Sequence, residues 1–252
     1  FYEDAQTASA ELDLTLTGRD CGEEDRAPMC GVPYHSCEPY IGKLIEKGYK
    51  VAICEQMEDP KLAKNLVKRE VTRIITPGTL IETDLLNERA NNYLATIYFD
   101  GSSIGMCFSD ISTAFMTATA FRDRYSEEDV INELSTYSPR EIILSCAAKS
   151  LPKVAEHVKK RMKVLLTEAA TDYFDPDEAI ERAEKQFSTD STAGRPRSAV
   201  IAVGAALKYI AETQKTDISY LKKLSFYDSS AYLEMDLSTR RNLELCETML
   251  TK

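Results

Sequence analysis

The chain of 252 residues is predicted to be an α/β protein with more than one domain. Apolar runs at strand spacing alternate with segments at helical spacing along most of its length. A charged, amide-rich segment over residues 81–92 separates two such stretches, and a strongly apolar helix is expected after residue 197. We therefore expect a small mixed-sheet α/β domain, a second α/β domain, and the start of an all-helical core.

The first domain is assigned to residues 1–80, where helical and strand patterns alternate. Ala5, Ala8 and Leu12 recur at helical spacing, and the helix after Pro39 should end at Gly48. The strand that begins at Val51 is short and apolar, so it is expected to be buried. The predicted elements are helices over 4–14 and 39–47 and strands over 14–17, 51–54 and 71–75.

The second domain is assigned to residues 93–197, after the linker 81–92. Three β-rich runs separated by turn residues predict an antiparallel meander. The predicted elements are strands over 93–99, 104–110, 114–120, 141–144 and 163–166 and helices over 127–137, 151–161 and 177–187. The apolar helix over 198–214 is expected to pack against other helices and to begin the all-helical region 198–252.

Composition argues against a protein that binds DNA mainly by neutralising phosphates. The chain has 41 acidic and 31 basic residues, a net charge of −10, and residues 1–79 alone hold 14 acidic and 10 basic residues. Any DNA contact must therefore be local. No apolar run is long enough to span a membrane, and seven cysteines without a C-x-x-C pair fit a reducing compartment. We expect a soluble cytoplasmic protein without a membrane partner.

Four sequence blocks carry a resemblance to a known family. They are Ala-Pro-Met-Cys-Gly-Val-Pro-Tyr-His over 27–35, Val-Ala-Ile-Cys-Glu-Gln over 51–56, the basic segment 68–74, and Thr-Pro-Gly-Thr over 76–79. In this order and spacing, they resemble the amino-terminal mismatch-recognition domain of the MutS family of DNA mismatch repair proteins. The resemblance implies that 93–197 is the family's ribonuclease H-like connector domain and that 198–252 begins the core or lever domain.

The resemblance also implies a function and a division of labour. The first domain would probe double-stranded DNA for mismatches or small loops, and the connector would relay that state to MutL. ATP and magnesium would be bound by a carboxy-terminal ATPase, whose G-x-x-x-x-G-K-[ST] motif does not occur here. We therefore expect this portion to be non-enzymatic and to bind no cofactor. The full-length bacterial protein is expected to be a homodimer associated with the nucleoid, whereas this portion should be mostly monomeric.

Candidate DNA-binding residues fall in two groups. The resemblance places the first group near the DNA backbone or minor groove: Arg19, Pro28, Met29 and His35. The second group is the densest basic cluster of these blocks and suits phosphates: Lys68, Arg69 and Arg73. The alternatives are ordinary loop and core packing for the first group, favoured for His35, and a solvated face for the second.

The opening residues look like the Phe-x-Glu pair with which the family wedges a mispaired base. An aromatic wedge suits a mismatch, because weakly stacked steps kink at lower cost. However, family members have a second, similar block just after this pair. Residues 1–5 align with that second block without a gap. We therefore interpret Phe1 as a core residue on a helix face, assign Glu3 no base contact, and expect the wedge pair upstream.

Three alternatives remain. Cys30, His35 and Cys37 could bind zinc, but a fourth ligand at the usual spacing is lacking, so we expect no metal. Asp110 follows a strand and could be the first carboxylate of a two-metal nuclease, although a turn-forming Asp is favoured because no second carboxylate signature is visible. A MutS relative that acts in recombination is disfavoured, because such relatives commonly lack the mismatch-reading domain.

Overall fold

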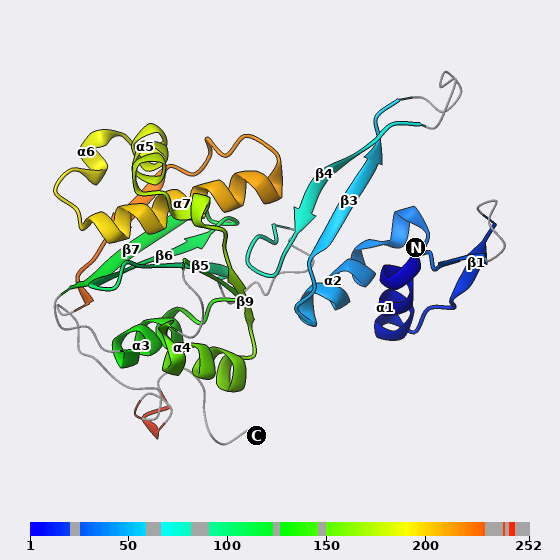
Figure 1. Ribbon diagram of the computed structural model, residues 1–252, viewed down its shortest axis with the longest axis horizontal. Coiled ribbons are helices and arrows are strands. Elements are labelled where there is room, and N and C mark those ends of the chain that lie inside the picture. Colours follow the sequence, from blue (N-terminus) through cyan, green and yellow to red (C-terminus); the bar gives the residue numbers. More distant parts are fainter. Residues whose placement is uncertain are drawn as a thin grey trace. The chain divides into compact units, whose positions relative to one another are not determined.

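The computed structural model divides into two compact units, residues 1–77 and residues 78–252 (Figure 1). It describes residues 1–20, 26–58, 67–81, 91–122, 127–145, 150–229, 239 and 242–244. Small two-stranded sheets in the first unit and a larger mixed sheet in the second confirm the predicted α/β class. Over these described ranges, no helix is long and apolar enough to cross a membrane.

The first unit opens with α1 (Tyr2–Leu12), which buries Ala5 and Leu12 and packs against the second of two short paired strands. These strands are β1 (Thr17–Arg19) and β2 (Ala27–Met29), joined antiparallel. The strand predicted over 14–17 is therefore wrong in position. Leu14 cannot start it, because its backbone N–H donates to the Ser9 carbonyl at 3.1 Å and extends the end of α1.

The remainder of the first unit is a helix followed by a two-stranded ribbon. The elements are η1 (Tyr34–Ser36), α2 (Glu38–Glu46), β3 (Val51–Gln56) and β4 (Arg69–Ile75). Lys47, just after α2, forms an ion pair of 2.6 Å with Glu11 of α1, and Tyr49 donates to the same carboxylate at 3.0 Å. The prediction that β3 is buried is wrong, because its residues are half-buried or exposed in a ribbon of only two strands.

The second unit is built on a six-stranded sheet in the order β10-β7-β6-β5-β8-β9. The strands are β5 (Tyr93–Phe99), β6 (Ser103–Asp110), β7 (Phe115–Arg122), β8 (Glu141–Leu144), β9 (Leu165–Glu168) and β10 (Lys223–Phe226). The first three pair antiparallel, as the predicted meander requires, and the others are parallel to their neighbours. This mixed sheet is the one expected of a ribonuclease H-like domain.

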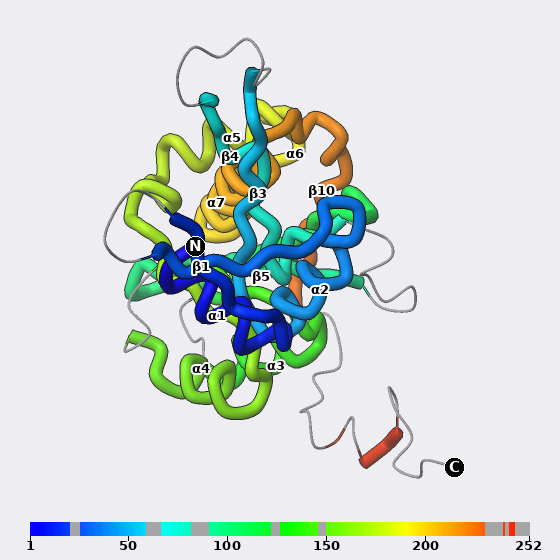
Figure 2. The backbone as a smooth tube through the Cα atoms, turned by 90° about the vertical axis from the view of Figure 1, so that its right-hand side faces the viewer, coloured from blue at the N-terminus to red at the C-terminus, as the bar shows by residue number. Residues whose placement is uncertain are grey.

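Helices cover both faces of this sheet (Figure 1, Figure 2). On one face lie α3 (Glu127–Tyr137), α4 (Pro152–His157) and the π-helical turn η4 (Val158–Met162). On the other lie η5 (Thr171–Phe174), α5 (Pro176–Phe187), α6 (Thr189–Thr192) and α7 (Arg197–Gln214). Two separate clusters of buried apolar side chains fill the two interfaces, so the second unit has three layers.

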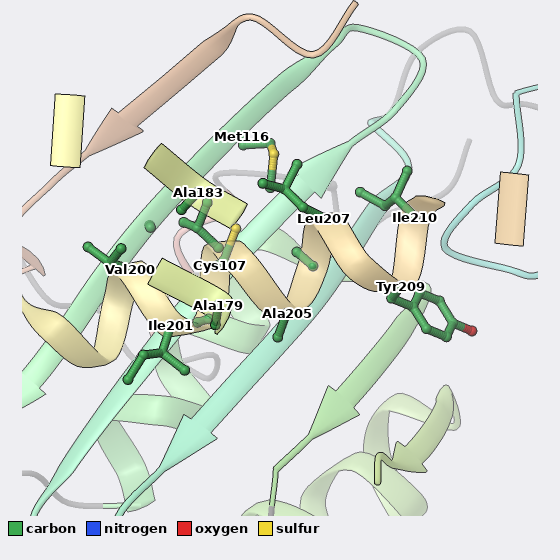
Figure 3. Packing of buried hydrophobic residues seen from close by; sticks show 14 of the residues in the cluster. Cys107, Met116, Ala179, Ala183, Val200, Ile201, Ala205, Leu207, Tyr209 and Ile210 are labelled. Carbon is green, nitrogen blue, oxygen red and sulfur yellow. The ribbon is translucent and has the colours of Figure 1, made fainter. Parts of the chain in front are cut away.

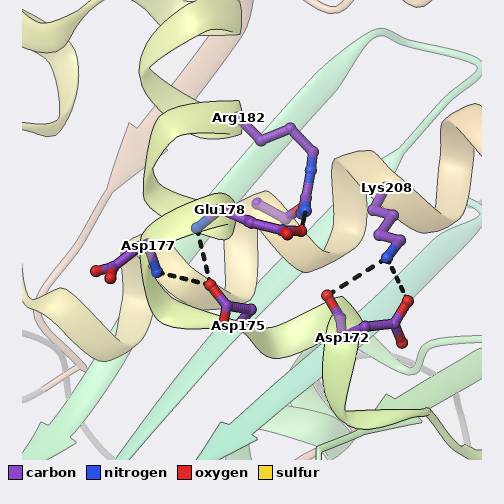
Figure 4. Close-up of polar contacts among 7 residues, drawn as sticks. Asp172, Asp175, Asp177, Glu178, Arg182 and Lys208 are labelled. Atoms are coloured by element: carbon purple, nitrogen blue, oxygen red, sulfur yellow. Dashed lines mark hydrogen bonds and ion pairs between the residues drawn. The ribbon is translucent and has the colours of Figure 1, made fainter.

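Polar contacts at the start of α5 hold three of these elements together (Figure 4). Asp175 caps α5 by accepting hydrogen bonds from the backbone N–H groups of Asp177 and Glu178, at 3.1 and 3.0 Å. Lys208 of α7 forms an ion pair of 2.6 Å with Asp172 of η5. The cap satisfies helix N–H groups that would otherwise lack a partner, and the ion pair joins η5 to α7.

Helix α7 lies in the core of the second unit and does not begin a separate helical region. Fourteen of its 18 residues are buried, and they pack against α5 and the sheet (Figure 3). Thr96 of β5 donates to the Ala202 carbonyl at 2.9 Å, and β10, which follows α7, pairs with β7. The boundary predicted at residue 198 is therefore wrong, because this helix buries its faces against the sheet.

The segment after β4 also belongs to the second unit, from Gly78 onward. The Gly78 N–H donates to the buried carboxylate of Glu141 at 3.1 Å, and the Gln214 side chain donates to the Thr79 carbonyl at 2.7 Å. The first compact unit thus ends at residue 77, three residues before the end predicted for the first domain. Residues 82–90 of the predicted linker lie outside the described residues.

Candidate nucleic-acid interface

The β1–β2 hairpin carries three of the predicted DNA-binding residues. In its register Arg19 lies opposite Ala27, and Gly18 lies opposite Pro28. The Arg19 side chain is exposed, whereas Pro28 and Met29 are half-buried. Met29 is held in place by its carbonyl, which accepts a hydrogen bond of 2.8 Å from the Thr17 hydroxyl. The hairpin thus presents Arg19 to solvent. The half-buried positions of Pro28 and Met29 are compatible both with packing and with DNA contact.

A second arginine lies on the same hairpin and was not predicted. Arg26 is exposed at the start of β2, and a Cβ at Gly18 would lie 3.0 Å from its Cβ atom. The absence of a side chain at Gly18 therefore lets the Arg26 side chain lie over β1. Only the strand pairing brings Arg26 next to Gly18, eight residues earlier in the sequence, so the sequence gave no signal for this approach.

His35 lies in the turn η1 with its side chain exposed, so it does not pack in the core of the first unit. The Ser36 N–H donates to the Pro33 carbonyl at 3.0 Å and closes this turn. The neighbouring Tyr34 is 82% exposed, the largest exposed fraction among the large apolar and aromatic side chains described as exposed.

The predicted basic cluster lies on the β3–β4 ribbon, where carboxylates neutralise it. Lys68 forms an ion pair of 2.6 Å with Glu70, and this hydrogen bond raises the pKa of Lys68. Residues 51–58 and 67–75 carry three basic side chains and three acidic ones: Lys68, Arg69 and Arg73 against Glu55, Glu58 and Glu70. The described ribbon therefore has no net charge, which weakens its attraction for phosphates.

A β-bulge also separates the two arginines of this cluster. Ile53 pairs with Arg73, but the next residue, Cys54, pairs with Val71, so Thr72 is an extra residue on β4. Arg69 pairs with Gln56, three positions along β3 from Ile53. Because residues an odd number apart on a strand point to opposite faces, and partners share a face, Arg69 and Arg73 lie on opposite faces of the ribbon.

Phe1 and Glu3 lie at the start of α1. Phe1 is the residue before the first helical turn, and Glu3 is an exposed residue of that turn. Phe1 is 50% exposed, so the interpretation of Phe1 as a core residue is wrong. The first buried residue of this helix is Ala5.

The zinc and nuclease alternatives find no geometry to support them. In the described ranges, no three His, Cys, Asp or Glu side chains are grouped to hold a metal ion. Asp110 is buried at the end of β6, where one oxygen accepts hydrogen bonds from the Ser112 N–H and hydroxyl, at 3.0 and 2.6 Å. This carboxylate therefore shapes the turn between β6 and β7.

Comparison with known proteins agrees with this architecture. The family model described as MutS domain I matches residues 1–84, and the model described as MutS domain II matches residues 92–224. The DNA mismatch repair protein MutS of Clostridium tetani is 43% identical over 253 residues, and that of Clostridium novyi is 42% identical over 252 residues.

Both alignments cover the whole chain but only 28% and 27% of these relatives. The MutS protein of Caldicellulosiruptor bescii is 43% identical over 252 residues, with 28% of its length covered. The chain thus spans about a quarter of the length of the relatives that it matches, with two consecutive family domains in their order. A match to domain II over more than half of the chain shows that it belongs to the MutS family.

Proposed function

We propose that this chain is the part of a DNA mismatch repair protein that contacts mispaired DNA and passes that state to the rest of the protein. The observation that carries this proposal is the succession of MutS domains I and II, with 43% identity over the whole chain to a relative named as a DNA mismatch repair protein. The proposal assigns DNA contact to the first unit and the connecting role to the second.

The exposed surface of the first unit supports DNA contact. Arg19 and Arg26 on the β1–β2 hairpin are exposed cations suited to phosphates or a narrow minor groove. Tyr34 and His35 lie on the turn η1 and are exposed planar side chains that can stack on a base or sugar. In a chain with a net charge of −10, such contacts have to be local.

The other activities belong to the longer protein. We propose that it binds ATP with magnesium in a further domain, pairs with a second copy of itself and engages MutL through the second unit. Its expected location is the bacterial cytoplasm, at the nucleoid. We propose no catalytic role for the two units described here, because their buried carboxylates act as turn-forming and anchoring groups.

The test is DNA binding by the chain and by a longer protein that carries it. Fluorescence anisotropy with G·T and G·C duplexes measures both affinity and mismatch preference. Replacing Arg19 and Arg26 by Gln should weaken binding to both duplexes and lower the salt slope by about 2, since each phosphate contact contributes about 0.9. The chain alone should discriminate G·T from G·C only slightly.

Lys43→Gln serves as the matched control, because Lys43 is an exposed residue of α2 in the same unit and away from the hairpin. This variant should keep the affinity and the salt slope of the parent. Failure of the longer protein to bind either duplex would refute the proposed function. Nanomolar discrimination by the chain alone would refute the expectation that it distinguishes the two duplexes only slightly.

A further inference from the structure

A second group of basic side chains lies on the second unit, at the end of α4. We call it the basic turn and define it as Lys159, Arg161 and Lys163, all three exposed. Lys160 forms an ion pair of 2.7 Å with Glu156, whereas the three members of the basic turn have no ion-pair partner in the part of the chain that the structure describes. Residues 152–163 hold five basic residues and one acidic residue, in a chain with a net charge of −10.

The backbone holds this turn in one conformation. Val158–Met162 forms a π-helical turn, which ends at Lys163 with a left-handed φ of 56° and a hydrogen bond of 2.8 Å from the Lys163 N–H to the Val158 carbonyl. Val158 is buried beneath it, in the cluster between the helices and the sheet. Single π-helical turns are rare in proteins overall, but those that occur often lie at functional sites. Here the turn anchors an apolar side chain inside and leaves three cations in solvent.

The spacing of the cations suits a nucleic-acid backbone. Four residues of an α-helix would span roughly 6 Å along its axis, and a π-helical turn is shorter, so Lys159 and Lys163 lie within roughly 6 Å of each other along the axis. One strand of duplex DNA carries a phosphate about every 3.4 Å along its axis. The basic turn can therefore meet about two successive phosphates of one strand.

We propose that the basic turn contacts the phosphate backbone of duplex DNA. The inference rests on the proposed function, which makes DNA the ligand, and adds a contact on the second unit. A protein partner is less suited, because cores of protein interfaces are rich in aromatic and apolar groups and poor in lysine. In the described range 150–168 no large apolar side chain is exposed, so this surface offers charge alone.

The test compares two triple variants of the 252-residue chain that remove equal charge. Lys159→Gln, Arg161→Gln and Lys163→Gln remove the basic turn. The control replaces Lys153, Lys160 and Arg197 by Gln. These residues of the same unit already form ion pairs, with Glu128, Glu156 and Asp177 respectively. Affinity for a G·C duplex is measured by fluorescence anisotropy over a range of salt concentrations.

Loss of the basic turn should reduce the slope of log affinity against log salt by about 1.8, at about 0.9 for each of the two phosphates that the turn can meet. The control should change the slope by less than a third of this amount. Equal slopes for the wild-type chain and the basic-turn variant would overturn the inference and leave an acidic protein surface as the alternative partner. Wild-type protein that binds no duplex at low salt would instead refute the proposed function, and the inference with it.

Cations in the last turn also stabilise a helix through its dipole, so folding is monitored in parallel. Far-UV circular dichroism and thermal melting are recorded for both triple variants. A charge-keeping variant, Lys159→Arg with Arg161→Lys and Lys163→Arg, should restore the wild-type salt slope. If it restored the melting temperature but not the slope, the DNA contact would be refuted.

Discussion

Glu141 is a buried side chain that connects distant segments of the second unit. It begins β8 and is fully buried, and its two oxygens accept hydrogen bonds from the Tyr209 hydroxyl at 2.6 Å and the Gly78 N–H at 3.1 Å. A buried carboxylate is tolerated only when it is hydrogen-bonded. These donors come from the start of the unit and from α7, so Glu141 fixes two distant segments against the sheet.

Glu141→Ala should lower the free energy of unfolding by about 2–3 kcal/mol, because it leaves the Tyr209 hydroxyl and the Gly78 N–H buried without this acceptor. Urea denaturation followed by circular dichroism measures the loss. Glu181→Ala, at an exposed position of α5, is the control and should stay within about 0.5 kcal/mol of the wild type. An equal effect of the two substitutions would contradict the anchoring role.

His157 makes the stability of the second unit depend on pH. Its partial burial, and then the nearby positive charge of Arg161, lower the pKa of His157 below 6.5. The unfolded chain therefore takes up a proton first as the pH falls, so stability is fully present above about pH 6.5 and decreases as the pH falls toward the folded pKa.

His157→Gln should flatten the decrease in stability between about pH 7 and pH 5. Chemical denaturation at several pH values measures it, with His35→Gln as the control at an exposed histidine. The same pH dependence in wild type and His157→Gln would show that another group is responsible. Arg161→Gln removes the nearby positive charge, so it should raise the folded pKa of His157 toward 6.5 and make this decrease in stability smaller.

At the scale of elements, the close approach of α5 and α7 depends on one glycine. A Cβ at Gly204 would lie 2.0 Å from the Ala179 carbonyl oxygen, which is backbone and cannot move aside cheaply. The Gly204 carbonyl in turn accepts a hydrogen bond of 2.9 Å from Arg182 of α5. The two helices can therefore cross this closely only where α7 has no side chain.

Gly204→Ala should destabilise the protein by about 1–3 kcal/mol through overpacking, although alanine favours a helix by about 1 kcal/mol over glycine. Thermal melting measures the balance. Gly31→Ala is the control, because nothing lies within 4 Å of the added Cβ and its backbone is not left-handed. A Gly204→Ala variant as stable as the wild type would mean that the helices separate at little cost.

The bulge in β4 is also an element-scale feature with consequences for function. Lys68, Arg69 and Arg73 are close in sequence, and a regular strand would put Arg69 and Arg73 on one face. The extra residue Thr72 breaks this alternation, and its hydroxyl donates to the Ile53 carbonyl at 3.4 Å. The ribbon therefore presents no common arginine face, and the hairpin arginines are the better candidates for phosphate contact.

At the scale of the whole molecule, the second unit needs the chain beyond residue 196 to complete its layers. A chain that ends at Pro196 would lose α7 and β10, and with them the apolar layer on one face of the sheet. We expect it to lose cooperative thermal unfolding of this unit, whereas a chain that ends at residue 229 should retain it. Circular dichroism measures both, and a cooperative transition in the shorter chain would contradict the three-layer architecture.

We also expect the chain to be mostly monomeric, because homodimerisation in the family is expected to run through the ATPase domain. Sedimentation at micromolar concentration should give a mass near 28.3 kDa. A net charge of −10 opposes self-association, most strongly at low salt. A tight dimer at this concentration would refute the prediction.

The sequence by itself determined much of the local structure of the second unit, although it did not predict β10, η5 or α6. The helix at Glu127–Tyr137 and the strands at Tyr93–Phe99 and Glu141–Leu144 have the predicted bounds, because periodic apolar residues specify the face that each element buries. The ordered blocks over 27–35, 51–56, 68–74 and 76–79 likewise determined the family.

Only the tertiary structure decided features that depend on distant partners. An apolar helix such as α7 can pack against helices or a sheet, and the choice is visible in the Thr96–Ala202 contact across 106 residues. The Thr72 bulge, the close approach of the Arg26 side chain to Gly18, and the basic turn's lack of ion pairs within the described residues are likewise set by neighbours in space. Periodicity specifies which face is apolar, but not which segment covers it or which charge neutralises its neighbour.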